Sequence, residues 1–139
     1  MAGIYVHVPF CKVKCHYCDF HFSVQLKSRS RMVDAMLAEM TERKDYLKAE
    51  EVKTIYFGGG TPSLLSEKQL KAIMSAIDLH FTVSTKAEIT LEANPDDLSQ
   101  DKLKMLKHNG INRLSIGIQS FFDSDLEWMN RSHNTMQSH

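Results

Sequence analysis

Cysteine is scarce in this chain of 139 residues: there are only three, and all lie between positions 11 and 18. An odd number of closely spaced cysteines cannot form a disulfide framework, which excludes the class of small disulfide-stabilised domains. Three thiolates on one short segment instead suit the ligands of a single metal centre. The few cysteines are therefore the first indication of function.

Net charge and long apolar runs are also absent. Seventeen basic residues balance seventeen acidic ones, so the charge gives no indication of a nucleic acid or an anionic membrane as partner. No run of about eighteen apolar residues occurs, and the first residues enter a strand pattern instead of a basic segment with a cleavage site. We therefore expect no membrane insertion and a cytoplasmic location. A hydrophobic fraction of 42% is typical of one folded domain.

Segments with strand character alternate with segments that have helical periodicity. Ser66 begins a capping-box pattern with Gln69, Ser99 is an N-cap candidate, and Asn109-Gly110 is typical of a helix end. The alternation predicts right-handed βαβ units, and so an α/β fold with about four parallel strands and covering helices. We predict strands over residues 4–8, 52–57, 87–93 and 111–118, and helices over about 30–48, after 66, after 99 and around 126–129.

Unusual residues follow each predicted strand. The cysteine segment comes after the first strand and Gly58-Gly59-Gly60 after the second, while Glu92 ends the third and Gln119 the fourth. Glycines let the backbone approach a ligand closely because they have no side chain. Ligands of parallel sheets collect at the carboxyl ends of the strands, so the pattern predicts a binding site at this edge.

The cysteines themselves permit two kinds of metal centre. Cys11, Cys15 and Cys18 on one loop can hold a cubane iron–sulfur cluster and leave its fourth iron open to a small molecule. The same cysteines with His21 could close a structural Cys3His zinc site in an interaction module. Their spacing leaves both open, and the glycine-rich strand end favours the cluster because it indicates a bound small molecule.

Four motifs, in this order, resemble those of radical S-adenosylmethionine (SAM) enzymes over the whole chain. The resemblance is greatest to the oxygen-independent coproporphyrinogen III oxidases and the related heme chaperones. It implies a [4Fe–4S] cluster on Cys11, Cys15 and Cys18, whose open iron takes the amino and carboxylate groups of SAM. The motifs are Tyr5-x-His7-x-Pro9-Phe10-Cys11-x3-Cys15-x-Tyr17-Cys18, Gly58-Gly59-Gly60-Thr61-Pro62, Leu91-Glu92-Ala93-Asn94-Pro95 and Ile116-Gly117-Ile118-Gln119-Ser120-Phe121.

The resemblance also implies which residues contact the cofactor. The glycine segment would contact the amino group of SAM, and three further positions would reach its ribose and carboxylate. In the family, one electron from the reduced cluster cleaves SAM to a radical that abstracts hydrogen from a substrate. The implied cofactor-binding residues are Gly59, Gly60, Thr61, Glu92, Gln119 and Arg131, and Tyr5 is the implied catalytic residue near the cluster.

Phe20 separates the two branches of this family. The oxidase branch has a further cysteine at this position, so Phe20 favours a heme chaperone, which binds heme and delivers it to a hemoprotein. The alternative is an oxidase that decarboxylates coproporphyrinogen, a porphyrinogen substrate. His133 and His139 could ligate heme iron, but histidines in a polar tail are more often simply exposed, and we expect them to be exposed.

The family barrel is longer than this chain. We therefore expect residues 1–139 to be the N-terminal part of a radical SAM (β/α) barrel that is truncated at its C-terminus. Truncation would expose the edge of the fourth strand, and an unpaired edge favours self-association of the fragment. Light scattering that finds only monomer at high protein concentration would contradict this expectation.

Overall fold

A computed structural model describes residues 2–48 and 50–139 of the chain. Strands and helices alternate, and short 3-10 helices follow or precede several of them. The elements are β1 (Ala2–Val8), η1 (Leu26–Ser28), α1 (Arg29–Glu42), β2 (Val52–Gly59), η2 (Pro62–Leu64), α2 (Glu67–His80), β3 (Val83–Ala93), η3 (Pro95–Asp97), α3 (Gln100–His108), β4 (Arg113–Ile116), α4 (Asp123–Trp128) and α5 (Thr135–Ser138).

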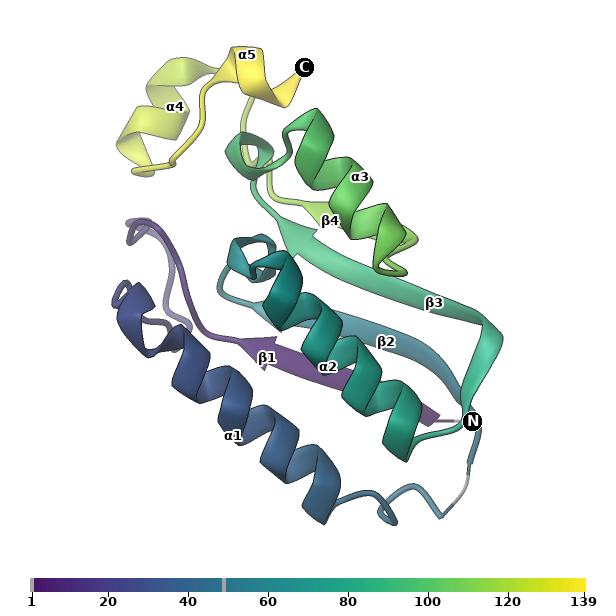
Figure 1. Cartoon of the computed structure of the whole chain (residues 1–139). Coiled ribbons are helices and arrows are strands. Elements are labelled where there is room, and N and C mark those ends of the chain that lie inside the picture. The colour runs from purple at the N-terminus through teal and green to yellow at the C-terminus, as the bar shows by residue number, and fades with distance from the viewer. Residues whose placement is uncertain (1, 49) are drawn as a thin grey trace.

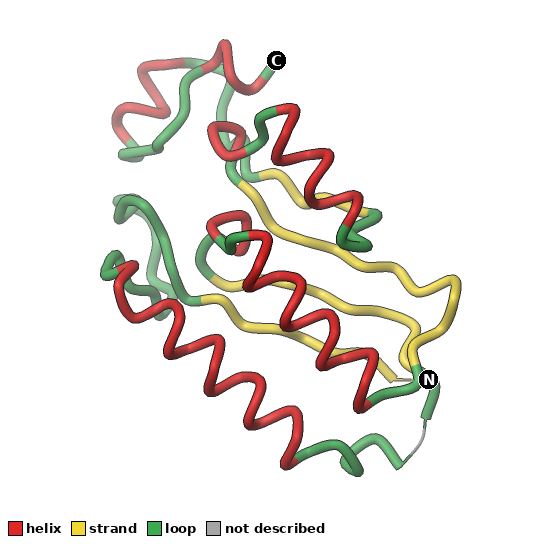
Figure 2. Tube along the Cα trace, viewed as in Figure 1, coloured by secondary structure: helices red, strands yellow, loops and turns green. Residues whose placement is uncertain are grey.

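The four strands form one sheet in the order β1-β2-β3-β4, and every pairing is parallel. Helices α1, α2 and α3 cover the same face of this sheet (Figures 1 and 2). Crossovers of one hand place all helices on one face when the strand order runs in a single direction, as it does in the wall of a barrel. The predicted α/β fold with four parallel strands and covering helices is confirmed.

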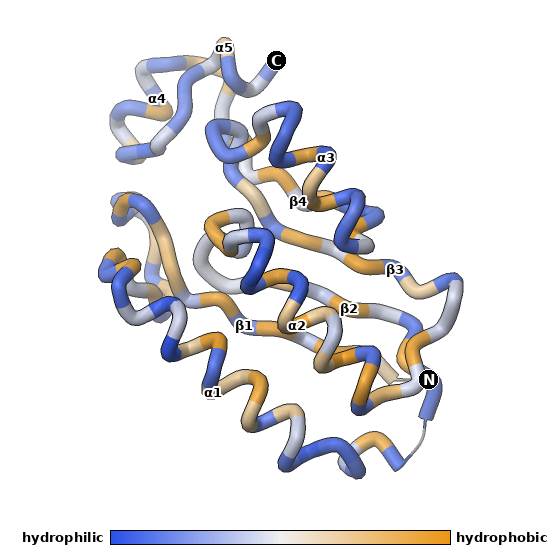
Figure 3. Tube along the Cα trace, viewed as in Figure 1, coloured by the Kyte–Doolittle hydropathy of each residue, from blue (hydrophilic) through white to orange (hydrophobic). Residues whose placement is uncertain are grey.

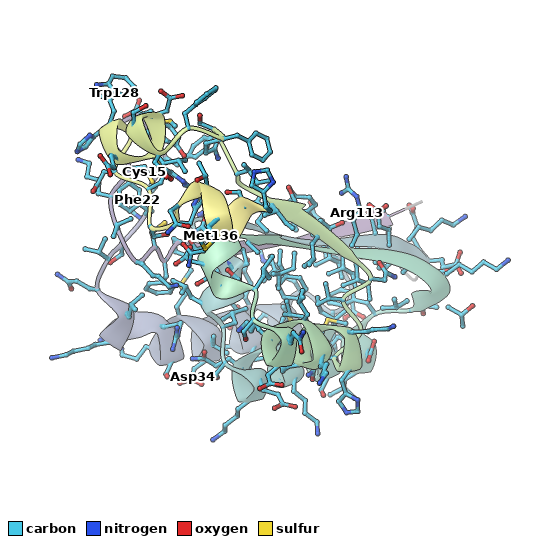
Figure 4. The ribbon with its side chains drawn as sticks, turned by 90° about the horizontal axis from the view of Figure 1, so that it is seen from above. Cys15, Phe22, Asp34, Arg113, Trp128 and Met136 are labelled. Carbon is cyan, nitrogen blue, oxygen red and sulfur yellow. The ribbon has the colours of Figure 1, made fainter. Side chains whose placement is uncertain are left out.

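The hydrophobic core lies between the sheet and these helices. Val6, Phe57 and Leu91 are in register on β1, β2 and β3, and each is at most 3% exposed. In Figure 3, apolar residues alternate with polar ones along the strands and helices, as expected where one side of each element packs on the core. The other face of the sheet is polar, and Figure 4 shows Arg113 on it, turned away from the helices.

Local signals in the sequence identify the start of α2 and both ends of α3. Ser66 and Gln69 form the predicted capping box at the start of α2, and the Ser99 hydroxyl accepts from the Lys102 N–H at 3.2 Å. Gly110 follows α3 with a φ of +91°, a conformation that favours glycine. These short-range predictions are confirmed. They could be made from the sequence because they depend only on neighbouring residues.

Several predicted element bounds are wrong, and β1 and β2 are each two residues longer than predicted, over Ala2–Val8 and Val52–Gly59. Helix α1 ends at Glu42, although the apolar pattern continues to Leu47, which packs on the core from the turns after the helix. Strand β3 begins at Val83 and not at residue 87. Strand β4 covers only residues 113–116 of the predicted 111–118. It is an edge strand, and its pairing with a second copy stays a prediction.

Within the described ranges, no helix combines the length and the apolar character needed to cross a bilayer.

Candidate metal and cofactor site

A cavity of about 770 Å³ opens at the carboxyl ends of the strands. The loop after β1, the glycine turn after β2 and the segments after β3 and β4 all contribute to its wall, as the strand-end argument predicts. Its size is in the range of small-molecule sites. The predicted site residues that line it are Cys11, Cys15, Cys18, Gly59, Gly60, Thr61, Glu92, Gln119 and Arg131.

The cysteine loop is packed tightly against the glycine turn. The Gly60 N–H donates to the Val8 carbonyl at 2.9 Å, and the Thr61 N–H donates to the Phe10 carbonyl at 2.7 Å. A Cβ atom on Gly60 would lie 2.9 Å from the Cys11 sulfur, closer than van der Waals contact. The absence of a side chain at Gly60 is therefore what lets Cys11 reach the cavity wall.

The middle of the cysteine loop is bound by a segment more than a hundred residues later in the chain. The His16 N–H donates to the Met129 carbonyl at 3.0 Å, and the His16 ring lies 2.7 Å from the Trp128 carbonyl oxygen. The Asn130 side chain donates to the Lys14 carbonyl at 2.7 Å. Figure 4 accordingly shows Cys15 and Trp128 at the same end of the molecule. Sequence reasoning missed this contact, because no local pattern marks it.

Arg131 joins three parts of the site. Its Nη2 donates to the Asn94 side-chain oxygen and to the Gly117 carbonyl, both at 2.7 Å. Its Nη1 lies 3.4 Å from the Cys15 sulfur and donates to the Tyr17 hydroxyl at 3.1 Å. The guanidinium therefore places a fixed positive charge beside the cysteines, where it favours a thiolate or another anion.

Glu92 connects β3 to the glycine turn. One of its carboxylate oxygens accepts from the Gly59 N–H at 3.0 Å, and the other accepts from the Tyr56 hydroxyl at 2.7 Å. The hydrogen bond to Glu92 raises the pKa of Tyr56, as does burial, because the carboxylate favours the neutral phenol. Glu92 thus fixes the turn as well as facing the cavity.

Gln119 and Tyr5 are placed differently. Gln119 lines the cavity and has a φ of +70°, a left-handed conformation that is rare for residues other than glycine and is typical of functional sites. Tyr5 is 59% exposed and lies outside the cavity wall. Its ring stacks on Tyr56, and its hydroxyl lies 3.2 Å from the His7 ring nitrogen Nδ1. Its catalytic role stays a prediction.

The three thiols match the donor set of an iron–sulfur cluster. Burial raises the pKa of the Cys11 thiol, and the Thr61 hydroxyl beside it offsets part of that shift. Among the described residues, no three His, Cys, Asp or Glu side chains already meet at one metal position, so binding requires the thiols to turn toward one another. His21, the fourth ligand of the zinc alternative, is exposed and is not part of the cavity wall. The donors and the cavity fit a cluster with a small-molecule ligand.

Sequence reasoning also missed an ion pair beside the cysteines. Lys12 binds Asp96 at 2.7 Å and also contacts Asp97, both in η3 at the end of β3. Burial lowers the pKa of Lys12, but the hydrogen bonds to the two carboxylates outweigh it, and the pKa lies above its ordinary value. The charges are visible in the sequence, but their pairing is not.

The prediction that His133 is exposed is wrong. Its side chain is buried, and its ring nitrogen Nε2 lies 2.9 Å from the Ile118 carbonyl oxygen, so Nε2 carries the proton. Its Nδ1 is buried without a hydrogen-bond partner among residues 2–48 and 50–139. Its burial could not be predicted from the polar residues around it, because it depends on a contact with the loop after β4 at Ile118.

His133 makes the stability of the fold depend on pH. Burial lowers its pKa in the folded chain, so the unfolded chain binds the extra proton first as the pH falls. We expect the full stability above the ordinary histidine pKa of about 6.5 and a progressive loss below it. Urea unfolding between pH 5 and pH 8 measures this, with ~6.5 as the upper end of the loss. His133→Gln, which keeps a donor for Ile118 but does not titrate, is expected to flatten the dependence, and an unchanged slope would contradict the assignment.

Comparison with known proteins identifies the family. The model of the radical SAM superfamily matches residues 5–138. The chain is 44% identical over 135 residues to the heme chaperone HemW of Bacillus subtilis, covering 96% of this chain and 36% of that protein. It is 37% identical over 139 residues to HemW of Escherichia coli, covering 98% and 36%. The chain spans about a third of the length of these relatives.

Solved structures agree with this family. The coproporphyrinogen III oxidase HemN of Escherichia coli, described as a radical SAM enzyme, superposes with a TM-score of 0.90 at 30% sequence identity. The match covers 98% of this chain and 32% of HemN, so the four strands and their helices correspond to part of the HemN barrel. The predicted resemblance is confirmed by sequence and by structure. The chain belongs to the radical SAM superfamily, in the branch that contains the heme chaperone HemW and HemN.

Proposed function

We propose that this chain holds a [4Fe–4S] cluster on Cys11, Cys15 and Cys18 and binds SAM in the adjoining cavity. The observation that carries the proposal is the convergence of three partly buried cysteines and a glycine turn on one cavity of about 770 Å³. Three soft thiolate ligands leave one iron of a cubane cluster free for a small molecule. Residues 1–139 then form the N-terminal part of a longer radical SAM barrel.

The residues around the cavity have distinct tasks in this proposal. The glycine turn at Gly59 and Gly60 brings backbone groups within reach of the amino group of SAM. Glu92 accepts hydrogen bonds from the ribose hydroxyl groups with the lone pairs that Gly59 and Tyr56 leave free. Arg131 favours a carboxylate beside the cysteines by its charge. When bound, the cluster and SAM would supply reductive cleavage of the SAM sulfonium. The protein would orient the two groups and exclude water.

For the whole protein we propose the task of a heme chaperone that takes heme to a hemoprotein acceptor. Phe20 supports it, since it is 77% exposed on the cavity wall at the position where the oxidase branch has a cysteine. The names of the relatives support it as well, because they are heme chaperones. The alternative is coproporphyrinogen III oxidase activity, which the likeness to HemN favours. Incubation with coproporphyrinogen, SAM and a reductant distinguishes the two, because only the oxidase forms vinyl products.

Anaerobic reconstitution with iron and sulfide tests the cluster. We expect bound iron and sulfide in equal amounts, and visible absorption that bleaches with dithionite and changes when SAM is added. Cys15→Ser is expected to abolish this absorption, and His21→Ala, at an exposed position outside the cavity wall, to leave it unchanged. Binding of one zinc without sulfide, lost in both variants, would instead establish the Cys3His site.

A further inference from the structure

The residue directly after the first cysteine forms an ion pair with residues far along the chain. Lys12 lies 84 positions before Asp96, and its ammonium is 2.7 Å from the Asp96 carboxylate. The same ammonium contacts Asp97, so one positive charge is shared by two neighbouring carboxylates. Both carboxylates follow the end of β3, beside Asn94, which itself lines the cavity.

The two carboxylates are nearly buried and bind two further segments of the site. The side chains of Asp96 and Asp97 are 10% and 5% exposed. Asp97 accepts from the Ser63 hydroxyl at 2.6 Å, and Ser63 lies just after the glycine turn. Asp96 accepts from the Ser132 hydroxyl at 2.9 Å, and Ser132 follows Arg131. Through Lys12, the two carboxylates therefore connect the cysteine loop to the residue just after the glycine motif and to the residue just after Arg131.

Electrostatics makes Lys12 the essential member of this group. Two adjacent carboxylates repel each other, and partial burial makes each of them costly without a positive partner. Lys102 also lies near Asp97, but its amino group donates to the Leu65 carbonyl at 2.8 Å. The charge that bridges both carboxylates is thus that of Lys12.

The position of Lys12 in the loop gives this ion pair its consequence. The backbone before it is fixed by the hydrogen bonds of Phe10 and Cys11, whose N–H donates to the Ser23 carbonyl at 3.0 Å. The Lys12 side chain fixes the backbone on the other side of Cys11. The backbone is therefore held on both sides of Cys11, which lines the cavity.

We propose that Lys12 is a positioning residue for the metal-binding loop, which its ion pair with Asp96 and Asp97 holds in the conformation that receives the cluster. This inference rests on the proposed function and deepens it. Lys12 acts through Cys11 and the loop, since its ammonium is already bound to the two carboxylates. Mutation of a residue that orients metal ligands from behind commonly lowers metal affinity by ten- to a hundredfold. We therefore expect iron to be lost ~10-fold faster or more when Lys12 is replaced.

The test compares Lys12→Met with Lys12→Arg, which keeps the charge, and with Lys14→Met, an exposed lysine of the same loop. Each chain is reconstituted with iron and sulfide, and the rate at which a chelator removes the iron is followed by visible absorption. We expect Lys12→Met to lose iron ~10-fold faster than wild type, and the other two variants to stay close to it. Melting of each chain without iron measures its stability separately.

A double variant separates positioning from stability. Adding Asp97→Asn to Lys12→Met removes one of the two uncompensated charges and the repulsion between them, so the melting temperature should recover in part while iron loss stays fast. Recovery of both the melting temperature and the iron retention in the double variant would overturn the positioning role. So would wild-type iron retention in Lys12→Met itself. Neither result would affect the assignment of the cluster to the three cysteines. Failure of the wild-type chain to take up iron and sulfide would instead overturn the proposed function. If Lys12→Met does not fold, the double variant alone decides.

Discussion

Alanine at position 60 is expected to push the cysteine loop off the glycine turn and to destabilise the chain by about 1–3 kcal/mol. The added Cβ would lie 2.8 Å from the Phe10 carbonyl oxygen, 2.9 Å from the Phe10 nitrogen and 2.9 Å from the Cys11 sulfur. Two of these atoms are backbone, and the Phe10 side chain is only 4% exposed. The loop cannot yield without breaking its own hydrogen bond to Thr61.

Gly117→Ala is the matched control for this change. Gly117 also lines the cavity, but the nearest atom to its added Cβ would be the end of the Gln119 side chain at 3.1 Å, which can rotate away. Urea unfolding measures the stability of both variants, and the rate of Cys11 alkylation measures the exposure of the loop. We expect faster alkylation in Gly60→Ala only. Equal stability and equal alkylation in the two variants would contradict the close packing of turn and loop.

The parts of the fold that were predictable depend on short stretches of sequence. The caps at Ser66 and Ser99 and the turn at Gly110 involve residues at most a few positions apart, and all three agree with the structure. The end of α1 was not predictable in this way. Leu47 keeps the apolar spacing of a helix because it packs on the core, although the backbone there already turns. Burial and helix formation produce the same pattern, so the pattern alone cannot separate them.

The candidate site was predictable where topology alone brings residues together. Parallel strands end at one edge, so the cysteine loop, the glycine turn and Glu92 had to be neighbours once the sheet was inferred. Contacts that depend on side-chain direction were not predictable. Nothing in one sequence indicates that Lys12 binds the carboxylates after β3, or that Trp128 and Met129 bind the loop at His16. These contacts bring together segments that are about eighty to more than a hundred residues apart.

Glu92→Gln is expected to weaken the glycine turn and to lower the pKa of Tyr56. Both carboxylate oxygens of Glu92 accept a hydrogen bond, one from Gly59 and one from Tyr56. An amide has only one oxygen, so its NH2 group would face one of these donors and leave it unpaired, at a cost of about 1–3 kcal/mol. Removal of the carboxylate also removes the interaction that raises the pKa of Tyr56, which should fall toward its ordinary value.

Glu88→Gln is the control, because Glu88 lies on the same strand four residues before Glu92 and is exposed. Urea unfolding gives the stability, and a titration followed by the ring NMR signals of Tyr56 gives its pKa separately from the other three tyrosines. We expect both to change in Glu92→Gln and neither to change much in Glu88→Gln. An unchanged tyrosine titration in Glu92→Gln would show that the hydrogen bond to Tyr56 does not persist in solution.

The same variant separates the two tasks that Glu92 has in the proposed function. A carboxylate offers about four lone-pair sites, and Gly59 and Tyr56 use two of them, so a hydrogen bond from a ribose hydroxyl can be accepted at the same time. If Glu92 both fixes the turn and binds ribose, Glu92→Gln weakens SAM binding to the reconstituted chain by ~10-fold in addition to the loss of stability. If it only fixes the turn, a second change that restores stability elsewhere will also restore SAM affinity. Equilibrium dialysis with labelled SAM, with stability measured in parallel, therefore assigns Glu92 to the ligand or to the turn.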